Sequence, residues 1–356
     1  MSNRRVDRLR GRLGESGLDG MLVTGLLNVR YLTGFTGSSG TALVTPEQSV
    51  FLTDFRYEEQ AALECRGWRT EILERASVQD IAERIGREGL SRLGFEEEHV
   101  VFKTWSELRD GLPGVELVPT AAVVERLRMV KEPCEIKAIR RAAGIADLAY
   151  EAVVSRIEPG MIERDVALEL DFFMRKHGAE KEGFDTIVAS GPRGALPHGK
   201  ASDRVIGSTD LVVLDYGAVS GGYNSDITRT VIAGRPDPKQ EEVYSVVLEA
   251  QRLAIEAIRP GLTGREIDAA ARDFIASRGY GPNFGHGLGH GLGLHCHDPG
   301  TLSRRGEIPL EPGMVFTVEP GVYIAGWGGV RIEDDIVVTE DGCEVLTRAE
   351  KRLSLV

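Results

Sequence analysis

The sequence is poor in the features that mark secreted and membrane-embedded proteins. Its four cysteines (Cys65, Cys134, Cys296 and Cys343) are widely spaced and form no C-x-x-C pair, so they indicate no disulfide scaffold. No run reaches the roughly 18 apolar residues of a membrane-spanning helix. No apolar segment follows the basic residues of the N-terminal stretch MSNRRVDRLRGRLGESG either. We therefore expect a cytoplasmic protein that does not enter a membrane.

Positive charge is also scarce. Lysine and arginine number 43 against 55 aspartates and glutamates, which gives a formal net charge of −12. Proteins that bind nucleic acids need clustered Lys and Arg, and no such cluster stands out beyond the short Arg-rich N-terminus. We expect no nucleic-acid partner. The 42% hydrophobic and 28% charged content is typical of a soluble globular protein.

The length of 356 residues predicts two domains, because single hydrophobic cores stop growing at about 250 to 300 residues. The first part alternates short strands and helices, which is typical of an α/β domain. A charged helical segment follows and places the boundary near residue 124, giving domains 1–124 and 125–356. Within the first domain we expect helices over 3–16, 56–66 and 77–90, a strand entered from the turn in 17–25, and short strands or loops over 31–45.

The second domain contains an internal repeat, which is the most informative structural feature of the sequence. The stretch PGMIERDVALELDFFMRKHGA at 159–179 resembles PGLTGREIDAAARDFIASRGY at 260–280, an offset of 101 residues. Each copy is followed by a phenylalanine, a glycine-rich stretch, a histidine, a strand ending in an acid, a turn and a second acid. The domain is therefore expected to be α+β, with two related halves of helices packed on a bent antiparallel hairpin.

Four carboxylates occupy matching places in the two halves. Asp215 and Asp226 flank the predicted hairpin LVVLDYGAVSGGYNSDITRTV, and Glu319 and Glu333 hold the equivalent places in VEPG and RIEDD. Two aspartates near a turn are more often a solvated hairpin end than a ligand pair. If the halves meet about a pseudo-two-fold axis, however, four converging carboxylates would repel one another strongly, and two divalent cations would offset their charge. A metal site with two ions follows as the leading hypothesis.

Four of the seven histidines lie in FGHGLGHGLGLHCHD at 284–298. Alternate glycines there let the backbone approach closely, and His290 in the middle of the run is the preferred metal ligand. His286 and His297 would flank it as contacts to substrate. We interpret Cys296 as a small reduced side chain, and we assign His177 and His295 no catalytic role. Asp334 and Asp335 are interpreted as strand-end or supporting groups.

Several stretches together resemble one known family. They are FDTIVASGPRGALPHGKASD, LDYGAVSGGYNSDITRT, GHGLGHGLGLHCHD, VEPGVYI and GGVRIEDD, and they are similar to the creatinase/aminopeptidase family with the pita-bread fold. Within that family the likeness is greatest to the Xaa-Pro peptidases, aminopeptidase P and prolidase. It extends through MLVTGLLNVRYLTGFTGSSG into the first domain, which resembles the creatinase N-terminal domain and would mediate formation of a homodimer.

The resemblance implies a role for each residue of the motifs. Two divalent metal ions, manganese in most members and cobalt or zinc in others, would be bound by Asp215, Asp226, His290, Glu319 and Glu333. A hydroxide bridging the two ions would attack the Xaa-Pro bond of a proline-containing peptide, with Glu319 handling the proton. His198 and His297 would stabilise the tetrahedral intermediate. His286, Arg331, Tyr323 and Phe184 would contact the substrate or support the site.

Substrate length and the competing functions remain open at this point. Prolidases cleave only dipeptides and commonly carry a basic residue soon after the histidine that matches His297, whereas HDPGTLSRR has none before Arg304. This favours aminopeptidase P, which accepts longer peptides, while the short first domain and PHGKASD favour prolidase. A metal-free binding module and creatinase would lack part of the five-ligand set, and a methionine aminopeptidase would lack so large a first domain.

Overall fold

The computed structural model describes residues 4–232 and 234–353, so Asn3, the first residue of the expected helix over 3–16, lies outside them. The chain divides into two compact units, Met1–Arg128 and Met129–Val356. In the described part of the chain, no helix combines the length and apolar character needed to cross a bilayer.

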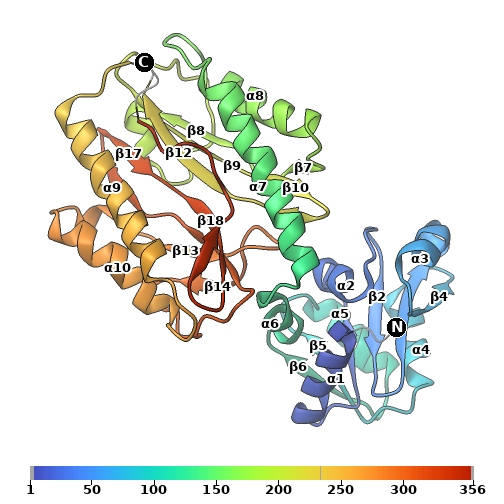
Figure 1. The fold of residues 1–356 in the computed structure, drawn as a ribbon. Coiled ribbons are helices and arrows are strands. Elements are labelled where there is room, and N and C mark those ends of the chain that lie inside the picture. The colour runs from blue at the N-terminus through green and yellow to red at the C-terminus, as the bar shows by residue number, and fades with distance from the viewer. Residues whose placement is uncertain (1–3, 233, 354–356) are drawn as a thin grey trace. The chain divides into compact units, whose positions relative to one another are not determined.

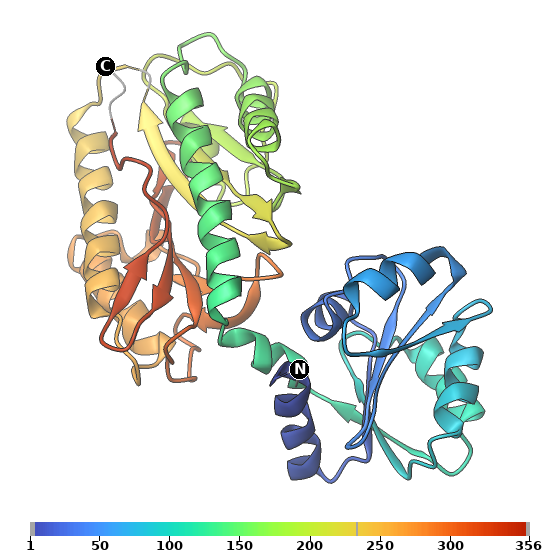
Figure 2. The same ribbon diagram turned by 45° about the vertical axis from the view of Figure 1, so that its right-hand side comes forward.

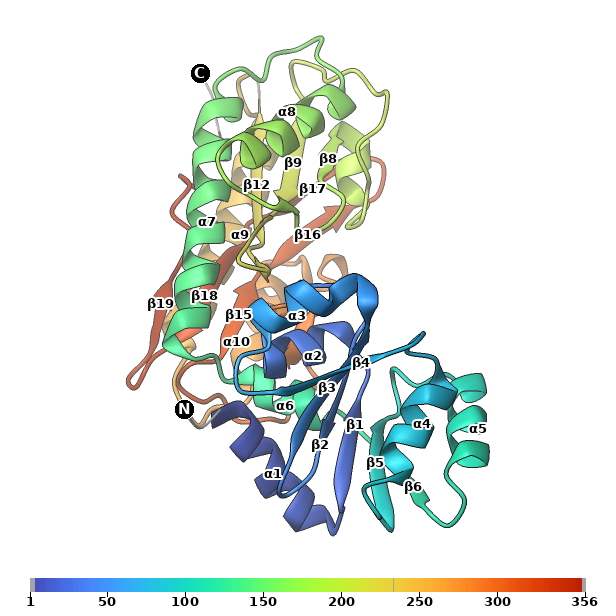
Figure 3. The same ribbon diagram turned by 90° about the vertical axis from the view of Figure 1, so that its right-hand side faces the viewer.

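The first unit is built on a six-stranded mixed sheet in the order β4-β3-β2-β1-β5-β6. Its strands are β1 (Gly20–Val23), β2 (Thr41–Val44), β3 (Ser49–Asp54), β4 (Arg69–Leu73), β5 (Arg92–Glu96) and β6 (Glu116–Thr120). Its helices are α1 (Arg4–Ser16), α2 (Leu26–Thr33), α3 (Glu58–Glu64), α4 (Val78–Gly86) and α5 (Phe102–Gly111), and α6 (Val123–Met129) spans the junction of the units. Figure 3 shows α1 on one side of the strands and α4 and α5 on the other.

One difference from the expected elements concerns residues 31–45. The structure places Tyr31 to Thr33 in helix α2, although the sequence suggested strands or loops there. The helix ends at Gly34, which adopts the left-handed conformation with φ of 84°. The two residues before the helix are held by a residue distant in sequence, since Glu96 accepts hydrogen bonds from the backbone N–H of Thr24 (2.6 Å) and Gly25 (2.7 Å). Because these residues are about 70 positions apart in the chain, no local sequence pattern could predict this contact.

The second unit consists of two halves that follow the same order of elements. The first half holds helices α7 (Pro133–Val154) and α8 (Glu163–Lys176), and the second holds α9 (Pro238–Ala257) and α10 (Gly264–Ser277). The bounds of α8 and α10 keep the offset of 101 residues seen in the sequence repeat. Figures 1 and 2 show the long helices α7 and α9 packed along the strands.

The strands of the second unit form several small antiparallel sheets. In the first half, β12-β9-β8 is one sheet and β11-β10-β7 another; in the second half, β14-β13-β15-β18-β19 is one sheet and β16-β17 another. The first-half strands are β7 (Lys181–Glu182), β8 (Ile187–Ser190), β9 (Leu211–Tyr216), β10 (Ala218–Ser220), β11 (Tyr223–Asn224) and β12 (Ile227–Ile232). The second-half strands are β13 (Gly289–Gly291), β14 (Asp298–Leu302), β15 (Val315–Val318), β16 (Gly321–Ile324), β17 (Gly328–Arg331), β18 (Asp334–Val338) and β19 (Cys343–Val345).

Each half has its own hydrophobic core between its helices and its strands. Val188, Val212 and Leu214 pack with the buried face of α7 and α8 in the first half. In the second half, Val318 and Ile336 pack with α9 and α10. The halves join where the backbone N–H of Glu333 donates to the carbonyl oxygen of Thr228 at 3.1 Å, so β12 and the residue before β18 lie side by side.

Candidate metal centre

The four matched carboxylates meet because of strand register. Asp215 lies near the end of β9 opposite Thr228 of β12, and Asp226 immediately precedes β12. Residues two apart on a strand share a face, so Asp226 is a diagonal neighbour of Asp215. In the second half, Glu319 immediately follows β15 and Glu333 immediately precedes β18. The link between Thr228 and Glu333 then brings the two pairs together.

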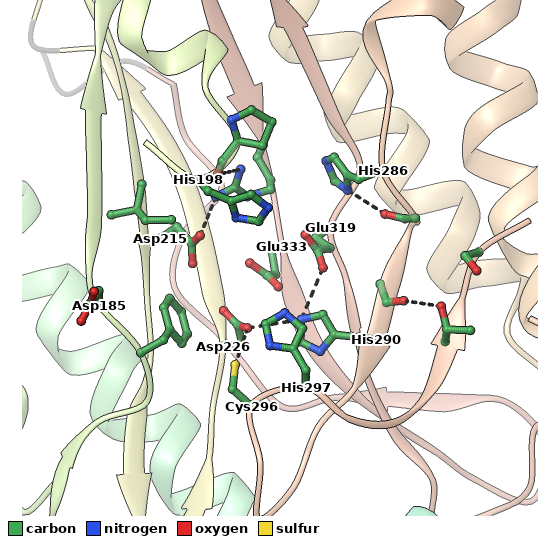
Figure 4. Close-up of a pocket in the computed structure, with 18 of the residues that line it drawn as sticks. Asp185, His198, Asp215, Asp226, His286, His290, Cys296, His297, Glu319 and Glu333 are labelled. Atoms are coloured by element: carbon green, nitrogen blue, oxygen red, sulfur yellow. Dashed lines mark hydrogen bonds and ion pairs between the residues drawn. The ribbon is translucent and has the colours of Figure 1, made fainter. Parts of the chain in front are cut away.

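One cavity of about 540 Å³ contains this meeting point. Among the residues predicted from the sequence, its lining includes Phe184, His198, Asp215, Asp226, His286, His290, His297, Glu319, Arg331 and Glu333. Figure 4 shows Asp215, Asp226, Glu319, Glu333 and His290 around a common space, with His297 beside His290. Tyr323 lies behind the wall, where its hydroxyl is 2.9 Å from Nε2 of His286 and accepts a hydrogen bond from Nη1 of Arg331 at 2.8 Å.

The four matched carboxylates are crowded, with Asp215, Asp226 and Glu333 buried and Glu319 partly buried. Burial, followed by the repulsion of neighbouring carboxylates, raises the pKa of Asp226 and of Glu333 well above the usual range. Burial raises the pKa of Glu319 to about 8, against the opposing effect of the Arg331 guanidinium. Two like charges about 4 Å apart repel by about 4 kcal/mol at an effective dielectric constant of about 20. The site therefore favours cations between the carboxylates.

The oxygen atoms that would bind a cation are free to do so. In the described residues, Oδ1 of Asp215 and Oδ1 of Asp226 are buried and accept no hydrogen bond. The other oxygens are held in place, because Oδ2 of Asp215 pairs with Nη2 of Arg331 at 2.5 Å and Oε2 of Glu333 accepts from Oγ1 of Thr228 at 2.5 Å. Buried carboxylate oxygens without partners are the donors that a hard divalent cation requires.

His290 presents the correct nitrogen to the same space. Its Nδ1 lies 3.0 Å from the carbonyl oxygen of Gly291, an acceptor, so Nδ1 carries the proton and Nε2 keeps its lone pair. Nε2 lies 3.6 Å from Oδ2 of Asp226 and 3.5 Å from Oε1 of Glu319. Burial lowers the pKa of His290 to about 4, which keeps the imidazole neutral and able to bind a metal. The ligand atoms of Asp226, His290 and Glu333 all lie within 4.8 Å of one another.

Backbone packing fixes the position of the histidine. A Cβ atom on Gly289, the residue before His290, would lie 1.9 Å from the carbonyl oxygen of Thr317 on β15. Glycine is therefore required where β13 pairs with that strand. The carbonyl oxygen of His286 is held as well, because Nη2 of Arg272 on α10 donates to it at 2.7 Å. The glycine-rich loop is thus part of the packed interior.

We predict that Gly289→Ala lowers the free energy of unfolding by about 3 kcal/mol, because the added methyl group must push apart two strand backbones. Gly285→Ala is the matched control, since a Cβ there meets nothing within 4 Å. Urea unfolding followed by circular dichroism measures both variants. Equal unfolding free energies for the two would show that the close approach at Gly289 does not constrain the loop.

The sequence analysis did not assign a functional role to several side chains that lie at the site. Cys296, read as a bland side chain, donates from Sγ to Oδ2 of Asp226 at 3.3 Å, and burial raises the pKa of its thiol so that it stays protonated. Asp335 accepts from the backbone N–H of Asp226 at 3.0 Å, in keeping with a supporting role. Asp185 and Lys200 line the cavity although no sequence pattern singled them out. For Cys296, its place between His295 and His297 was the one sequence feature that could have indicated a position at the site.

Comparisons with known proteins agree with this arrangement. Residues 137–340 match the model of metallopeptidase family M24, and residues 5–130 match the creatinase/prolidase N-terminal domain. An uncharacterised peptidase of Bacillus subtilis is 49% identical over 98% of this chain and 99% of its own length. These matches confirm the predicted creatinase-like first domain and pita-bread second domain.

Solved structures agree in fold as well as in sequence. The Xaa-Pro dipeptidase of Bacillus anthracis is 46% identical, with a TM-score of 0.96 and coverage of 99% of both chains. The X-Pro aminopeptidase of Thermotoga maritima is 38% identical, with a TM-score of 0.91 and coverage of 98% of this chain and 99% of its own. By its sequence, its fold and its cluster of candidate metal ligands, the chain belongs to metallopeptidase family M24.

Proposed function

We propose that the protein is a metal-dependent peptidase that hydrolyses the bond between an N-terminal residue and proline. The observation that carries this proposal is the cavity in which four carboxylates, three of them buried, and the Nε2 atom of His290 converge. Relatives named for Xaa-Pro hydrolysis supply the substrate class. Asp215, Asp226, His290, Glu319 and Glu333 would hold two divalent ions, and manganese is the proposed metal.

When bound, such ions generate a nucleophile from water at neutral pH and polarise a carbonyl oxygen. The protein's own groups would position and transfer protons. Glu319, with Oε1 oriented by Oγ1 of Thr317 at 3.2 Å, would accept the proton of the attacking water. His198 and His297 line the same cavity and would donate hydrogen bonds to the oxygen that becomes negatively charged.

A second group of residues would shape the pocket for the proline ring. Nδ1 of His286 lies 2.7 Å from the carbonyl oxygen of Gly287, so its Nε2 accepts from the Tyr323 hydroxyl. Burial lowers the pKa of His286 to about 4 and raises that of Tyr323 to about 12, so both remain neutral. The neutral imidazole and the ring of Phe184 both line the cavity and would offer apolar contacts to a pyrrolidine ring.

Substrate length divides the proposal into two forms. The lack of a basic residue soon after His297 favours an aminopeptidase that accepts longer peptides. The comparisons favour the alternative, a dipeptidase, since identity to the Bacillus anthracis dipeptidase is 46% and to the Thermotoga maritima aminopeptidase 38%. We propose the dipeptidase. The first unit would form the contact of a homodimer, and the enzyme would act in the cytoplasm.

Hydrolysis of Ala-Pro, Ala-Pro-Ala and a longer Xaa-Pro peptide, with Mn²⁺ added, tests this choice. We expect kcat/KM for Ala-Pro to exceed that for the tripeptide by about tenfold or more, because only the dipeptide carries a carboxylate on its proline. Faster cleavage of the tripeptide would establish the aminopeptidase form. Failure to cleave any of the three would contradict the proposed activity.

A further inference from the structure

The cavity that holds the candidate metal centre contains one cationic side chain without a buried partner. Among the described residues that line the cavity, one arginine, Arg331, and one lysine, Lys200, carry a positive charge. Figure 4 shows Asp185, the partner of Lys200, apart from the group formed by Asp226, Glu319 and Glu333. Lys200 and Asp185 form an ion pair in which both side chains are 74% exposed, so they lie at the mouth of the cavity.

Arg331 is committed to the protein itself. A guanidinium has five N–H groups. In Arg331, Nε donates to Thr228 Oγ1 at 3.0 Å, and Nη1 donates to the carbonyl oxygen of Pro197 at 3.2 Å and to the Tyr323 hydroxyl at 2.8 Å. Nη2 pairs with Asp215 at 2.5 Å. These four bonds leave one N–H of Nη2, so a substrate carboxylate that made the usual pair of parallel bonds to this guanidinium would have to displace at least one of them, which is costly.

Lys200 has the opposite character, with a fixed backbone and a movable ammonium group. Its carbonyl oxygen accepts from Nη2 of Arg193 at 2.7 Å, and its N–H donates to the carbonyl oxygen of His198 at 3.0 Å. The ammonium group can leave an exposed aspartate at little cost, since exposed ion pairs contribute little to stability. Lys200 is thus the cation of the described lining that can exchange its partner for a ligand.

The spacing along the chain suits a short substrate. His198, proposed above to contact the scissile carbonyl, and Lys200 are two residues apart and directly linked, because the N–H of Lys200 donates to the carbonyl oxygen of His198 at 3.0 Å. In a dipeptide the terminal carboxylate lies one residue, or about 3.5 Å of chain, beyond that carbonyl. In a longer peptide the same place is taken by a neutral amide, which leaves Lys200 paired with Asp185.

We propose that Lys200 binds the free carboxylate of the substrate's terminal proline and so directs the enzyme toward Xaa-Pro dipeptides, an inference that rests on the proposed function. Prolidases commonly carry a basic residue soon after the histidine that matches His297, but this chain has none there before Arg304. Lys200 would supply the positive charge instead. It determines which substrates bind and does not contact the reacting atoms, which lie at the metal centre.

Steady-state kinetics with Ala-Pro and its C-terminal amide test the proposal. Lys200→Met should raise KM for Ala-Pro about tenfold, the value of one charge-assisted hydrogen bond, with kcat within about twofold. KM for the amide should not change. Lys200→Arg should keep most of the preference, and Lys176→Met, at an exposed lysine of α8, is the control. Asp185→Asn should lower KM for Ala-Pro about twofold, because it frees the ammonium group.

An unchanged KM for Ala-Pro in Lys200→Met, or an equal rise for dipeptide and amide, would overturn the assignment. If the wild-type protein with Mn²⁺ cleaves neither compound, the proposed function fails. Calorimetric binding of Ala-Pro and its amide to wild-type and Lys200→Met protein then decides the role of Lys200 separately. Tighter binding of the dipeptide that disappears in the variant supports it, and equal affinities refute it.

Discussion

Replacing Glu333 by glutamine should reduce hydrolysis of Ala-Pro by at least about 1000-fold while the protein stays folded. A 1000-fold loss corresponds to about 4 kcal/mol of transition-state stabilisation. Glu333 is 2% exposed and lies where the two halves of the second unit meet. Glutamine can still accept the hydrogen bond from Thr228, but it loses the negative charge that a cation between the halves requires. Rates, metal content by atomic absorption and circular dichroism should be measured on the same samples.

A nearby surface glutamate provides the control. Glu340→Gln, at an exposed position after β18, should leave both hydrolysis and metal content unchanged. If Glu333→Gln retained activity within tenfold of the wild-type rate and a full complement of metal, Glu333 would not be a metal ligand. Loss of the circular dichroism signal would instead point to a structural role in joining β12 to β18.

Removing metal should lower the melting temperature of the wild-type protein by about 5 to 10 °C. Without cations, Asp215, Asp226, Glu319 and Glu333 face one another in a buried space. A ligand present at about 100 times its dissociation constant stabilises the folded state by about 2.7 kcal/mol, and a domain of this size shifts by about 2 to 4 °C per kcal/mol. Differential scanning fluorimetry after chelation, with and without added Mn²⁺, measures the change.

The Asp226→Asn variant separates metal binding from general effects of the chelator. It should show little response to Mn²⁺, because it lacks one ligand. Its chelated form should melt above chelated wild-type protein, since one buried carboxylate that repels its neighbours is gone. Identical melting temperatures for chelated and Mn²⁺-loaded wild-type protein would mean that no ion binds between the carboxylates.

The repeat in the sequence is what made the fold predictable. Two segments 101 residues apart with the same pattern of apolar and acidic positions predicted two similar halves, and helices α8 and α10 begin and end at that spacing. The predicted hairpin around Asp215 and Asp226, matched by Glu319 and Glu333 in the second copy, likewise predicted that the four carboxylates converge. Periodic patterns and internal repeats can be detected in a single sequence, because the first depend on neighbouring residues and the second occur twice in the chain.

Contacts between distant residues could not be predicted in the same way. Glu96 holds the residue before helix α2, and Nε2 of His286 accepts from the Tyr323 hydroxyl, which itself accepts from Arg331. The position of Lys200 at the cavity mouth follows from the hydrogen bonds of its backbone with His198 and Arg193. Such partners are set by tertiary packing, which leaves no spacing rule in the chain.

The most direct test is the rate of Ala-Pro hydrolysis by protein that has been stripped of metal and then titrated with Mn²⁺. We expect no hydrolysis by the stripped protein and a rise to a plateau as about two ions bind per chain. Full hydrolysis by protein shown to be free of metal would contradict metal-dependent chemistry. A fully loaded protein that left Ala-Pro and longer Xaa-Pro peptides uncut would contradict the proposed substrate.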